Sequence, residues 1–476
     1  MYIGHSMTNS SNSDTIAAIA TPVGVGGISV VRISGEHAMR IAARVFCGKV
    51  NLETAASHTA HFGRVITKEG NTIDEVVATI FVGPNSYTGE DTIEISCHGG
   101  ILVTRRMLEI LLQEGARLAE SGEFSKRAFL NGRLDLSQAE AVADLINAQT
   151  TKAHQASIYQ LEGALSERIH KLRSDLINSV GLLELELDFV EEDLEFINKR
   201  EFIKTVDAVK NEVVELIRTF KFGRIYREGV KVAIVGPPNA GKSSLLNALL
   251  ESNRAIVTDV PGTTRDTIEE SVTIGGLSFK LVDTAGLRNT EDIVEREGIK
   301  RAQHEAKTSD IILTVVDASE GAERSHDHAV NHFIHNLGEP PDRCILVLNK
   351  SDLPGRQPIG ILEFYGFRGS DDFVQVSAKT RSGIVHLHKL LVDKAVCGKA
   401  EANDSSTTVT NARHHDALRR AEASLSLSLR SLDQGQSNEL VAVDLRNALD
   451  CLGEITGEVT TEEILNSIFS KFCVGK

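Results

Sequence analysis

The sequence contains no tryptophan and only 5 tyrosines, and its 6 cysteines are scattered without a C-x-x-C pair. Scattered cysteines argue against a zinc knuckle and a disulfide framework, and they suit a reducing cytoplasm. No stretch approaches the roughly 18 apolar residues of a membrane span, so no membrane association is expected. Met1–Ser13 is polar, lacks the apolar core of a secretory signal and predicts a frayed tail. The sequence leaves open whether Met1 or Met7 is the true start.

An excess of basic residues is also missing. The 51 Lys and Arg are outnumbered by 66 Asp and Glu, which gives a formal net charge of −15. A nucleic-acid-binding protein usually presents a basic face. Any contact with RNA must therefore use a local basic patch or a partner, because long-range attraction to a polyanion is unfavourable.

The 476 residues predict two to four domains at roughly 100–200 residues each. Residues 14–131 mix short apolar runs with glycine-rich turns. Ile28–Ile33 and Val76–Val82 have the pattern of strands, and Val103–Leu112 that of a helix. This first segment is therefore predicted to be an α+β domain.

Residues 132–228 are predicted to be helical. Ser137 and Glu140 have the spacing of a capping box, and apolar residues then recur at intervals of three and four. That stripe comprises Leu172, Leu176, Val180, Leu183 and Leu187. Helix returns in residues 397–476, where Arg413–Leu432 and Leu440–Leu452 are periodic and Thr460–Glu463 caps a last helix.

Residues 229–396 alternate strand-like and helical runs, which is typical of a doubly wound α/β domain. The predicted strands are Val230–Val235, Phe279–Val282, Ile311–Val316, Ile345–Leu348 and Phe373–Val376. Because helix lies on both sides, this domain is expected to be inserted into a helical domain through closely spaced ends. The predicted fold is multidomain: an α+β N-terminal domain, an α-helical central domain and an inserted Ras-like α/β P-loop GTPase domain.

Gly236–Ser243 fits the phosphate-binding pattern G-x-x-x-x-G-K-[ST], after a predicted strand and before a predicted helix. The loop N–H groups and the helix N-terminus favour a bound phosphate. Lys242 is predicted to reach the β- and γ-phosphates, and the Ser243 hydroxyl to bind Mg²⁺.

Three further motifs follow later strands in the order of a guanine-nucleotide site. Asp283 of Asp283–Gly286 can hold Mg²⁺ through water, and the Gly286 N–H can meet a γ-phosphate. Asp352 of Asn349–Asp352 can accept the N1 and 2-amino hydrogens of guanine, which adenine lacks. Ser377–Lys379 is expected to close over the base. Together the four motifs predict a GTP-binding and GTP-hydrolysing protein.

The residue after Asp283–Gly286 departs from the Ras pattern, which has a water-orienting Gln there. This chain has Leu287, so another residue must orient the water. Glu295 and Glu297 are candidates and Arg288 is a charged neighbour. A solvated helix face remains the alternative for each.

Motifs outside the GTPase region resemble the tRNA-modification GTPases of the MnmE (TrmE) family over nearly the whole chain after the first ~15 residues. The resemblance rests on these segments: Thr21–Gly27, Val31–Gly35, Ser86–Asp91, His98–Gly100, Gly122–Ser125, Arg127–Asn131, Leu134–Leu136 and the terminal Cys473–Lys476.

The resemblance implies a homodimer formed through the N-terminal domains, where a tetrahydrofolate one-carbon donor (5-formyl or methylene) binds. It implies a flavoprotein partner, MnmG (GidA), which supplies FAD, and a reaction at C5 of the wobble uridine of certain tRNAs. By position, Arg32, Glu94 and Arg133 match the folate contacts, although the family often has Lys at the last position. From the residues alone, strand-edge salt bridges are the commoner explanation.

The resemblance also implies hydrolysis that depends on K⁺. Asn239, Thr258, Val260 and Thr263 match the K⁺ ligands, Val260 through its carbonyl. Thr264 matches a second Mg²⁺ ligand, and Glu295 the water-orienting residue. The residues assigned to GTP are Asn239, Ala240, Gly241, Lys242, Ser243, Ser244, Thr258, Thr263, Thr264, Asp283, Gly286, Asn349, Lys350, Asp352, Ser377, Ala378 and Lys379. Those assigned to catalysis are Glu295, Asp283, Arg265, Arg288 and Cys473.

Cys473 lies fourth from the end, as in a prenylation box, but Gly475 and Lys476 do not suit lipidation. It is either a buried structural cysteine or, as the resemblance implies, a functional thiol facing the folate. Cys97 beside His98 is expected to be local packing.

Two other functions fit the GTPase motifs alone. A ribosome-assembly or signalling switch GTPase should carry a basic RNA-binding module, and none is visible. A membrane-associated scaffold should carry an amphipathic basic helix or a lipid site. The N-terminal motifs and the Cys473 tail favour the tRNA-modifying enzyme.

Overall fold

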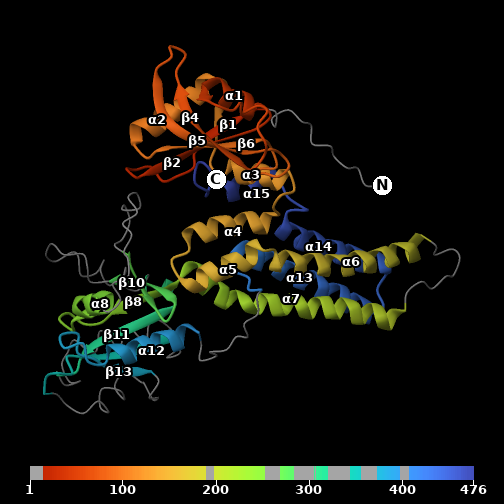
Figure 1. The fold of residues 1–476 in the computed structure, drawn as a ribbon. Helices are drawn as coiled ribbons and strands as arrows, with labels where there is room; N and C mark the ends of the chain where they lie inside the picture. Colours follow the sequence, from red (N-terminus) through yellow and green to blue (C-terminus); the bar gives the residue numbers. More distant parts are fainter. Residues whose placement is uncertain are drawn as a thin grey trace, which may run out of the picture. The chain divides into compact units, whose positions relative to one another are not determined.

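The computed structural model describes residues 14–188, 198–251, 269–283, 305, 307–319, 343–354, 372–396 and 407–476. The chain forms two compact units, and Figure 1 shows its helices and strands. The first comprises Met1–Ala143, Gln160–Val209 and Arg420–Lys476, and the second Asp144–Tyr159 and Lys210–Arg419. Among the described residues, no helix has both the length and the apolar character needed to cross a bilayer.

The N-terminal domain is built on a sheet whose described strands run in the order β3-β4-β5-β6-β2-β1-β7. All neighbours are antiparallel except β1 and β7. The strands are β1 (Ile16–Ile19), β2 (Ile28–Ser34), β3 (Phe46–Gly48), β4 (Thr59–Ile66), β5 (Thr72–Phe81), β6 (Thr92–His98) and β7 (Arg117–Leu118). Helices α1 (Ala38–Val45) and α2 (Ile101–Gln113) supply buried residues to the same core, and α3 (Glu123–Leu130) follows β7. The predicted α+β domain is confirmed.

The helical domain comprises α4 (Leu136–Asn147), α5 (Thr151–Leu161), α6 (Ala164–Asp188), α7 (Lys199–Glu228), α13 (Ala412–Asp433), α14 (Asn438–Thr456) and α15 (Glu462–Phe469). The expected stripe on α6 buries Leu172, Leu176, Val180 and Leu183. One detail differs: the box that caps α4 begins at Asp135. Its carboxylate accepts from the Gln138 N–H at 2.9 Å, and the Gln138 Oε1 accepts from the Asp135 N–H at 3.0 Å.

The inserted α/β domain has a sheet in the order β13-β12-β11-β8-β10-β9 among its described strands. Its elements are β8 (Val230–Val235), α8 (Lys242–Glu251), β9 (Glu269–Ile274), β10 (Leu277–Asp283), β11 (Ile311–Asp317), β12 (Cys344–Asn349), β13 (Phe373–Gln375) and α12 (Ile384–Ala395). Only β9 runs antiparallel to its neighbour. Because the other strands are parallel, their carboxyl ends and the loops after them share one edge of the sheet.

The chain enters and leaves this domain at adjacent points within the second unit. The Val409 N–H donates to the Thr219 hydroxyl on α7 at 3.0 Å. A Cβ on Gly223 would lie 2.0 Å from the Val409 carbonyl oxygen, so only glycine fits there. Phe220 and His415 stack with ring centroids 4.1 Å apart. The expected insertion is thus confirmed at its junction.

Candidate functional site

The loop Gly236–Ser243 joins β8 to α8 and has a backbone that requires glycine at two positions. Gly236 has φ 152° and Gly241 has φ 89°. An added Cβ would lie 2.1 Å from the Val315 carbonyl oxygen at Gly236 and 2.3 Å from Asn349 Nδ2 at Gly241. The loop therefore packs closely against the neighbouring strands β11 and β12, where a side chain at either position would not fit.

Lys242 lies at the mouth of this loop. Its ammonium donates to the carbonyl oxygens of Gly236 at 3.0 Å and Pro237 at 2.9 Å. Ser243 and Ser244 are exposed on the first turn of α8, where the helix N-terminus adds positive potential. Ala240 is buried, and Asn239 is exposed with φ 64°. These positions form a cationic cradle with exposed hydroxyls at its rim.

Asn349 joins this cradle to the loops after β12 and β13. Its Nδ2 donates to the Ala240 carbonyl oxygen at 2.9 Å, and its Oδ1 accepts from the Ala378 N–H at 3.1 Å. Asp352 accepts from the Ser377 hydroxyl at 2.7 Å, and this hydrogen bond lowers the pKa of Asp352, with a smaller contribution from Lys379. The structure thus brings three of the four predicted motifs together.

The rest of the predicted GTPase site lies outside the described residues. Asp283 ends β10 opposite Ile234, but its side chain belongs to the undescribed part. The others outside the described part are Thr258, Val260, Thr263, Thr264, Arg265, Gly286, Arg288, Glu295 and Glu297.

A second cluster of predicted residues lies in the N-terminal domain. Arg32 on β2 and Glu94 on β6 are paired across the strands, and the Arg32 Nε donates to a Glu94 carboxylate oxygen at 2.9 Å. The guanidinium lies 5.3 Å from the ring centroid of Tyr87 and 5.5 Å from that of Phe124. Arg133 is exposed and lies beside Gly89. Arg32 and Glu94 form one pair, and no contact recorded among the described residues joins Arg133 to it.

The C-terminal tail packs against this pair. Val474 bridges Ser121, and the Gly475 carbonyl oxygen accepts from the Arg32 guanidinium at 3.4 Å. The Lys476 ammonium lies 5.8 Å from the Tyr87 ring centroid. Burial, then repulsion from Arg32, lowers the pKa of Lys476. Sequence reasoning missed Lys476 and Tyr87, because contacts between such distant positions leave no local pattern.

The two cysteines singled out in the sequence have different environments. Cys473 is exposed, so the alternative of a buried structural cysteine is wrong. Cys97 is buried, its thiol donates to the Ser29 carbonyl oxygen at 3.5 Å, and burial raises its pKa. Cys97 is therefore a packing residue, as expected.

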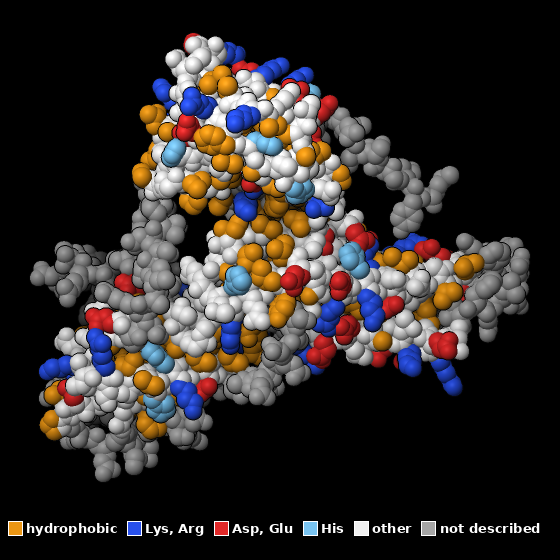
Figure 2. Space-filling view, in the orientation of Figure 1, with side chains coloured by type: hydrophobic (Ala, Val, Ile, Leu, Met, Phe, Trp, Pro, Cys, Tyr) orange, Lys and Arg blue, Asp and Glu red, His pale blue; other side chains and the backbone are white. Residues whose placement is uncertain are grey.

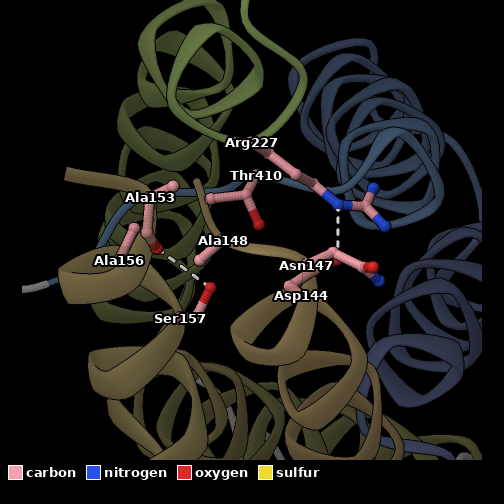
Figure 3. A pocket seen from close by; sticks show the side chains of 8 residues that line it. All are labelled: Asp144, Asn147, Ala148, Ala153, Ala156, Ser157, Arg227 and Thr410. Carbon is pink, nitrogen blue, oxygen red and sulfur yellow. Dashed lines mark hydrogen bonds and ion pairs between the residues drawn. The ribbon is translucent and has the colours of Figure 1, made fainter. Parts of the chain in front are cut away.

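A cavity of about 40 Å³ lies within the second unit, and Figure 3 shows its lining. Arg227 donates to Asp144 at 2.8 Å at one side, and the Ser157 hydroxyl donates to the Ala153 carbonyl oxygen at the other. This volume suits a few water molecules. None of the predicted site residues lines it.

Comparison with known families matches the chain in two parts. Residues 15–133 match the family described as the GTP-binding protein TrmE N-terminus, and residues 136–473 match the MnmE helical domain.

Curated relatives match over almost their entire length. The tRNA modification GTPase MnmE of Acetivibrio thermocellus is 41% identical over 97% of this chain and 99% of its own. The proteins of the same description from Clostridioides difficile and Chlorobium luteolum are 44% and 46% identical, over 97% of this chain and 99% and 97% of theirs.

Among solved structures, a GTP-binding protein from Sulfolobus solfataricus in complex with GDP matches with a TM-score of 0.29 and 18% identity. That match covers 48% of this chain and 68% of the other. The two family models and the near-complete alignments to curated relatives are decisive: the chain belongs to the MnmE family of tRNA modification GTPases.

Proposed function

We propose that the protein hydrolyses GTP and uses it, with a flavoprotein partner, to modify C5 of the wobble uridine of certain tRNAs. The observation that carries the proposal is the joining of the phosphate loop, Asn349–Asp352 and Ser377–Lys379 by the side chain of Asn349, in a chain of this family. The alternative, a switch GTPase without such chemistry, lacks a supporting observation.

The cradle has a cation for the phosphates of a nucleoside triphosphate and a hydroxyl for its Mg²⁺. Glycines at 236 and 241 leave room for backbone approach, and Lys242 can exchange its two carbonyl partners for β- and γ-phosphate oxygens. Ser243 and Thr264 are proposed Mg²⁺ ligands, with Asp283 acting through water. The ion neutralises phosphate charge as hydrolysis proceeds. Gly286 is proposed to donate its N–H to the γ-phosphate.

Base selection is assigned to Asp352. Its carboxylate is oriented by the Ser377 hydroxyl and kept ionised by its lowered pKa. Two acceptor oxygens in one plane complement the N1–H and 2-amino groups of guanine. Lys350 and Ala378 flank this edge.

Catalysis in this proposal needs positive charge and an oriented water. Asn239 on the phosphate loop, with Thr258, Val260 and Thr263, is proposed to hold K⁺ beside the phosphates. Glu295 is proposed to orient the attacking water, because Leu287 cannot. Arg265 and Arg288 are proposed to support the charge that develops.

The Arg32 and Glu94 pair is proposed as the folate site, with Arg133 as a third contact. A carboxylate accepts well from the amide and amino edge of a pterin, and cations pair with the glutamate carboxylates. The fit is chemically sound, because Arg32 and Lys476 are two cations beside the aromatic ring of Tyr87. The exposed thiol of Cys473 lies on the same tail and is proposed to act in the tRNA chemistry.

A homodimer through the N-terminal domain is supported by a mostly apolar row across the outer face of its sheet, interrupted by Ser96 on β6. Phe62 on β4 lies opposite Val77 on β5, and they are 67% and 39% exposed. Ile28 on β2 is 70% exposed on the same face. Such a row on a monomer indicates an interface, and a second copy is the proposed occupant.

The tRNA and flavoprotein partners are proposed from the family. Figure 2 shows basic and acidic side chains interspersed on the face that it presents. That pattern is consistent with tRNA being held partly by the partner, MnmG (GidA), which supplies FAD. The five cysteines that the structure describes are free thiols, which suits the cytoplasm, the compartment that we propose.

The test is reconstitution with the purified flavoprotein, FAD, a tetrahydrofolate donor, GTP, K⁺ and unmodified tRNA. We expect a new C5 substituent on the wobble uridine by mass spectrometry of nucleosides, and none when GTP or the folate is omitted. GTP hydrolysis without any change in the nucleosides would instead support the switch GTPase.

A further inference from the structure

Asp317 is an acidic residue at the edge of the candidate nucleotide site that no motif includes. It ends β11 directly opposite Asn349, the last residue of β12. The Ala318 N–H donates to the Asn349 carbonyl oxygen at 2.8 Å. The two strand ends are therefore joined at the point where the guanine-binding loop begins.

Both carboxylate oxygens of Asp317 are engaged. Oδ1 accepts from the Ser319 N–H at 2.9 Å and the Ser319 hydroxyl at 2.6 Å. Oδ2 pairs with the Lys350 ammonium at 2.5 Å. Burial alone would raise the pKa of Asp317, but the hydrogen bonds from Lys350 and Ser319 outweigh it and lower the pKa. The side chain is thus an oriented, ionised anchor.

Lys350 is the residue that this anchor holds. Its backbone is left-handed, with φ 61°, which is uncommon for a residue with a side chain. It follows Asn349, which fixes the phosphate loop, and it precedes Asp352 by two residues. With its ammonium tied to Asp317, the four-carbon stem of Lys350 spans from β12 to β11 across the carboxyl ends of the strands.

We propose that Asp317 is a positioning residue for the base: it holds the stem of Lys350 as a flat apolar wall against one face of the guanine ring. This inference rests on the proposed GTP-binding function. Without Asp317 the lysine side chain must be ordered when the nucleotide binds, and the entropy of that ordering weakens affinity.

Contact with the face of the base and hydrogen bonding to its edge are assigned to different residues. Asp352 reads the edge of the ring, so its loss changes the preference between guanine and hypoxanthine, which lacks the 2-amino group. Asp317 acts through the ring face, which the two bases share. Its loss should lower affinity for GDP and IDP by the same factor.

The test measures dissociation constants of GDP and IDP for full-length protein by competition with a fluorescent guanine nucleotide. We expect Asp317→Asn to weaken both by about tenfold, within the limit that the entropy of a long side chain sets. Glu251→Gln is the matched control, because Glu251 pairs with Arg381 on the surface of the same domain. That variant should bind both nucleotides as wild type does.

A double-mutant cycle tests whether Asp317 acts through Lys350. Lys350→Met keeps most of the stem and removes the charge, so Asp317→Asn should add no further loss in that background. The maximal hydrolysis rate at saturating GTP should be unchanged in Asp317→Asn while KM rises. An additive loss in the double variant, or a lower maximal rate with unchanged KM, overturns the positioning role.

Folding is checked by the thermal unfolding of nucleotide-free protein. If Asp317→Asn does not fold, Ser319→Ala replaces it: it removes the hydroxyl donor from Oδ1, which keeps only the backbone N–H of residue 319, and it should weaken GDP and IDP equally, by a smaller factor. Wild-type protein that fails to bind guanine nucleotides contradicts the proposed function. Wild-type binding with unchanged affinity in the variants contradicts only this inference.

Discussion

The side chain of Asp352 is small, exposed and hydrogen-bonded to Ser377, and it offers the sharpest single-residue test of base choice. Asp352→Asn replaces one acceptor with a donor facing the donors of guanine. We expect GTP affinity to fall by roughly one to two orders of magnitude, because a hydrogen bond to a charged group is lost. Affinity for xanthosine triphosphate should rise, as competition binding would detect. Unchanged GTP affinity would remove Asp352 from the base site.

The side chains proposed for hydrolysis lie outside the described residues, so kinetics must test them. Glu295→Ala should retain GTP binding and slow single turnover by about 10²-fold, the order of effect that a misplaced reactant has. Glu297→Gln tests the other candidate carboxylate, and it should hydrolyse GTP at the wild-type rate if Glu295 orients the water. An unchanged single-turnover rate in Glu295→Ala would show that Glu295 does not orient the water and is an ordinary surface charge.

Asn239 on the phosphate loop allows a test of whether hydrolysis depends on K⁺. At equal ionic strength, wild-type hydrolysis should be faster in K⁺ than in Na⁺, because Na⁺ fits the same oxygen cage poorly. Asn239→Ala should remove that difference while Mg²⁺-dependent GTP binding persists. Equal wild-type rates in the two salts contradict the proposed K⁺ ligands.

Among single residues, the sequence predicted those that belong to short, contiguous motifs. The phosphate loop and Asn349–Asp352 are short patterns, and each has its meaning within a few positions of the chain. Asp317 and Lys476 were not predicted, because an acidic strand end and a terminal lysine acquire partners only in the folded chain. The side chains proposed for K⁺ and water orientation stay predictions.

Two glycines within helices are expected to have opposite effects on stability when each is replaced by alanine. Gly181 on α6 has open space around an added Cβ, whereas Gly223 on α7 packs against Val409. Gly181→Ala should stabilise the protein by about 0.5–1 kcal/mol, the usual cost of glycine in a helix. Gly223→Ala should destabilise it by about 1–3 kcal/mol, as overpacking does. Urea unfolding measures both, and stabilisation by Gly223→Ala would contradict the close approach.

Helix α3 is held to the segments before β1 and β6 by a buried arginine. Arg127 is 2% exposed and pairs with Asp14, Glu90 and Glu123. Arg127→Met should destabilise the N-terminal domain by about 3 kcal/mol, the low end for a broken buried pair, because Glu90 loses its guanidinium partner while Asp14 and Glu123 keep Arg117. Arg64→Met, which breaks an exposed pair with Glu75, should cost at most about 1 kcal/mol.

The same network predicts a pH dependence with a definite sign. Burial alone would raise the pKa of Asp14 and Glu123, but the hydrogen bonds from Arg117 and Arg127 lower both. A depressed pKa contributes stability above the unfolded value of about 4 and loses it as the pH falls further. Denaturation of wild type should therefore become easier below about pH 4, and Arg127→Met should show a flatter dependence.

Strands differed in how well the sequence predicted them. The fully buried strands of the inserted domain were found within a residue or two, because their apolar runs are continuous. In the N-terminal domain only β2 and β5 were predicted. Strands β1, β3 and β7 span only two to four residues and β4 contains a glycine, so their periodicity is weak, whereas the alternation in β6 was overlooked.

On the scale of the whole molecule, the domain boundaries at 131/132, 228/229 and 396/397 stay a prediction. Periodicity located helices before and after the nucleotide domain. It could not locate the boundary between the helical domain and the nucleotide domain, because α7 continues up to the nucleotide domain without a turn signal.

Coupling between nucleotide and tRNA chemistry is the prediction at this scale. A GTP analogue with K⁺ should bring the two nucleotide domains of a dimer together, because a ligand shifts a two-state element when it binds the states unequally. Glu320, a natural label position, lies outside the described residues. Val385 on α12 is exposed, and a non-natural side chain there leaves Cys47 and Cys473 untouched. Equal label distances with analogue and GDP would contradict the coupling.

The contact between Gly223 and Val409 has a consequence for how such a chain can be assembled. Two positions that flank the whole nucleotide domain in sequence touch in space, so a short bridge between them would close the helical frame without it. The nucleotide domain is thus inserted at one place in the helical domain, and α5 also lies against it, since a Cβ on Gly276 would be 3.8 Å from the Lys152 side chain. An ancestral helical protein could have acquired its GTPase by one insertion event, and exchange with the nucleotide domain of a relative needs only two cuts at one place.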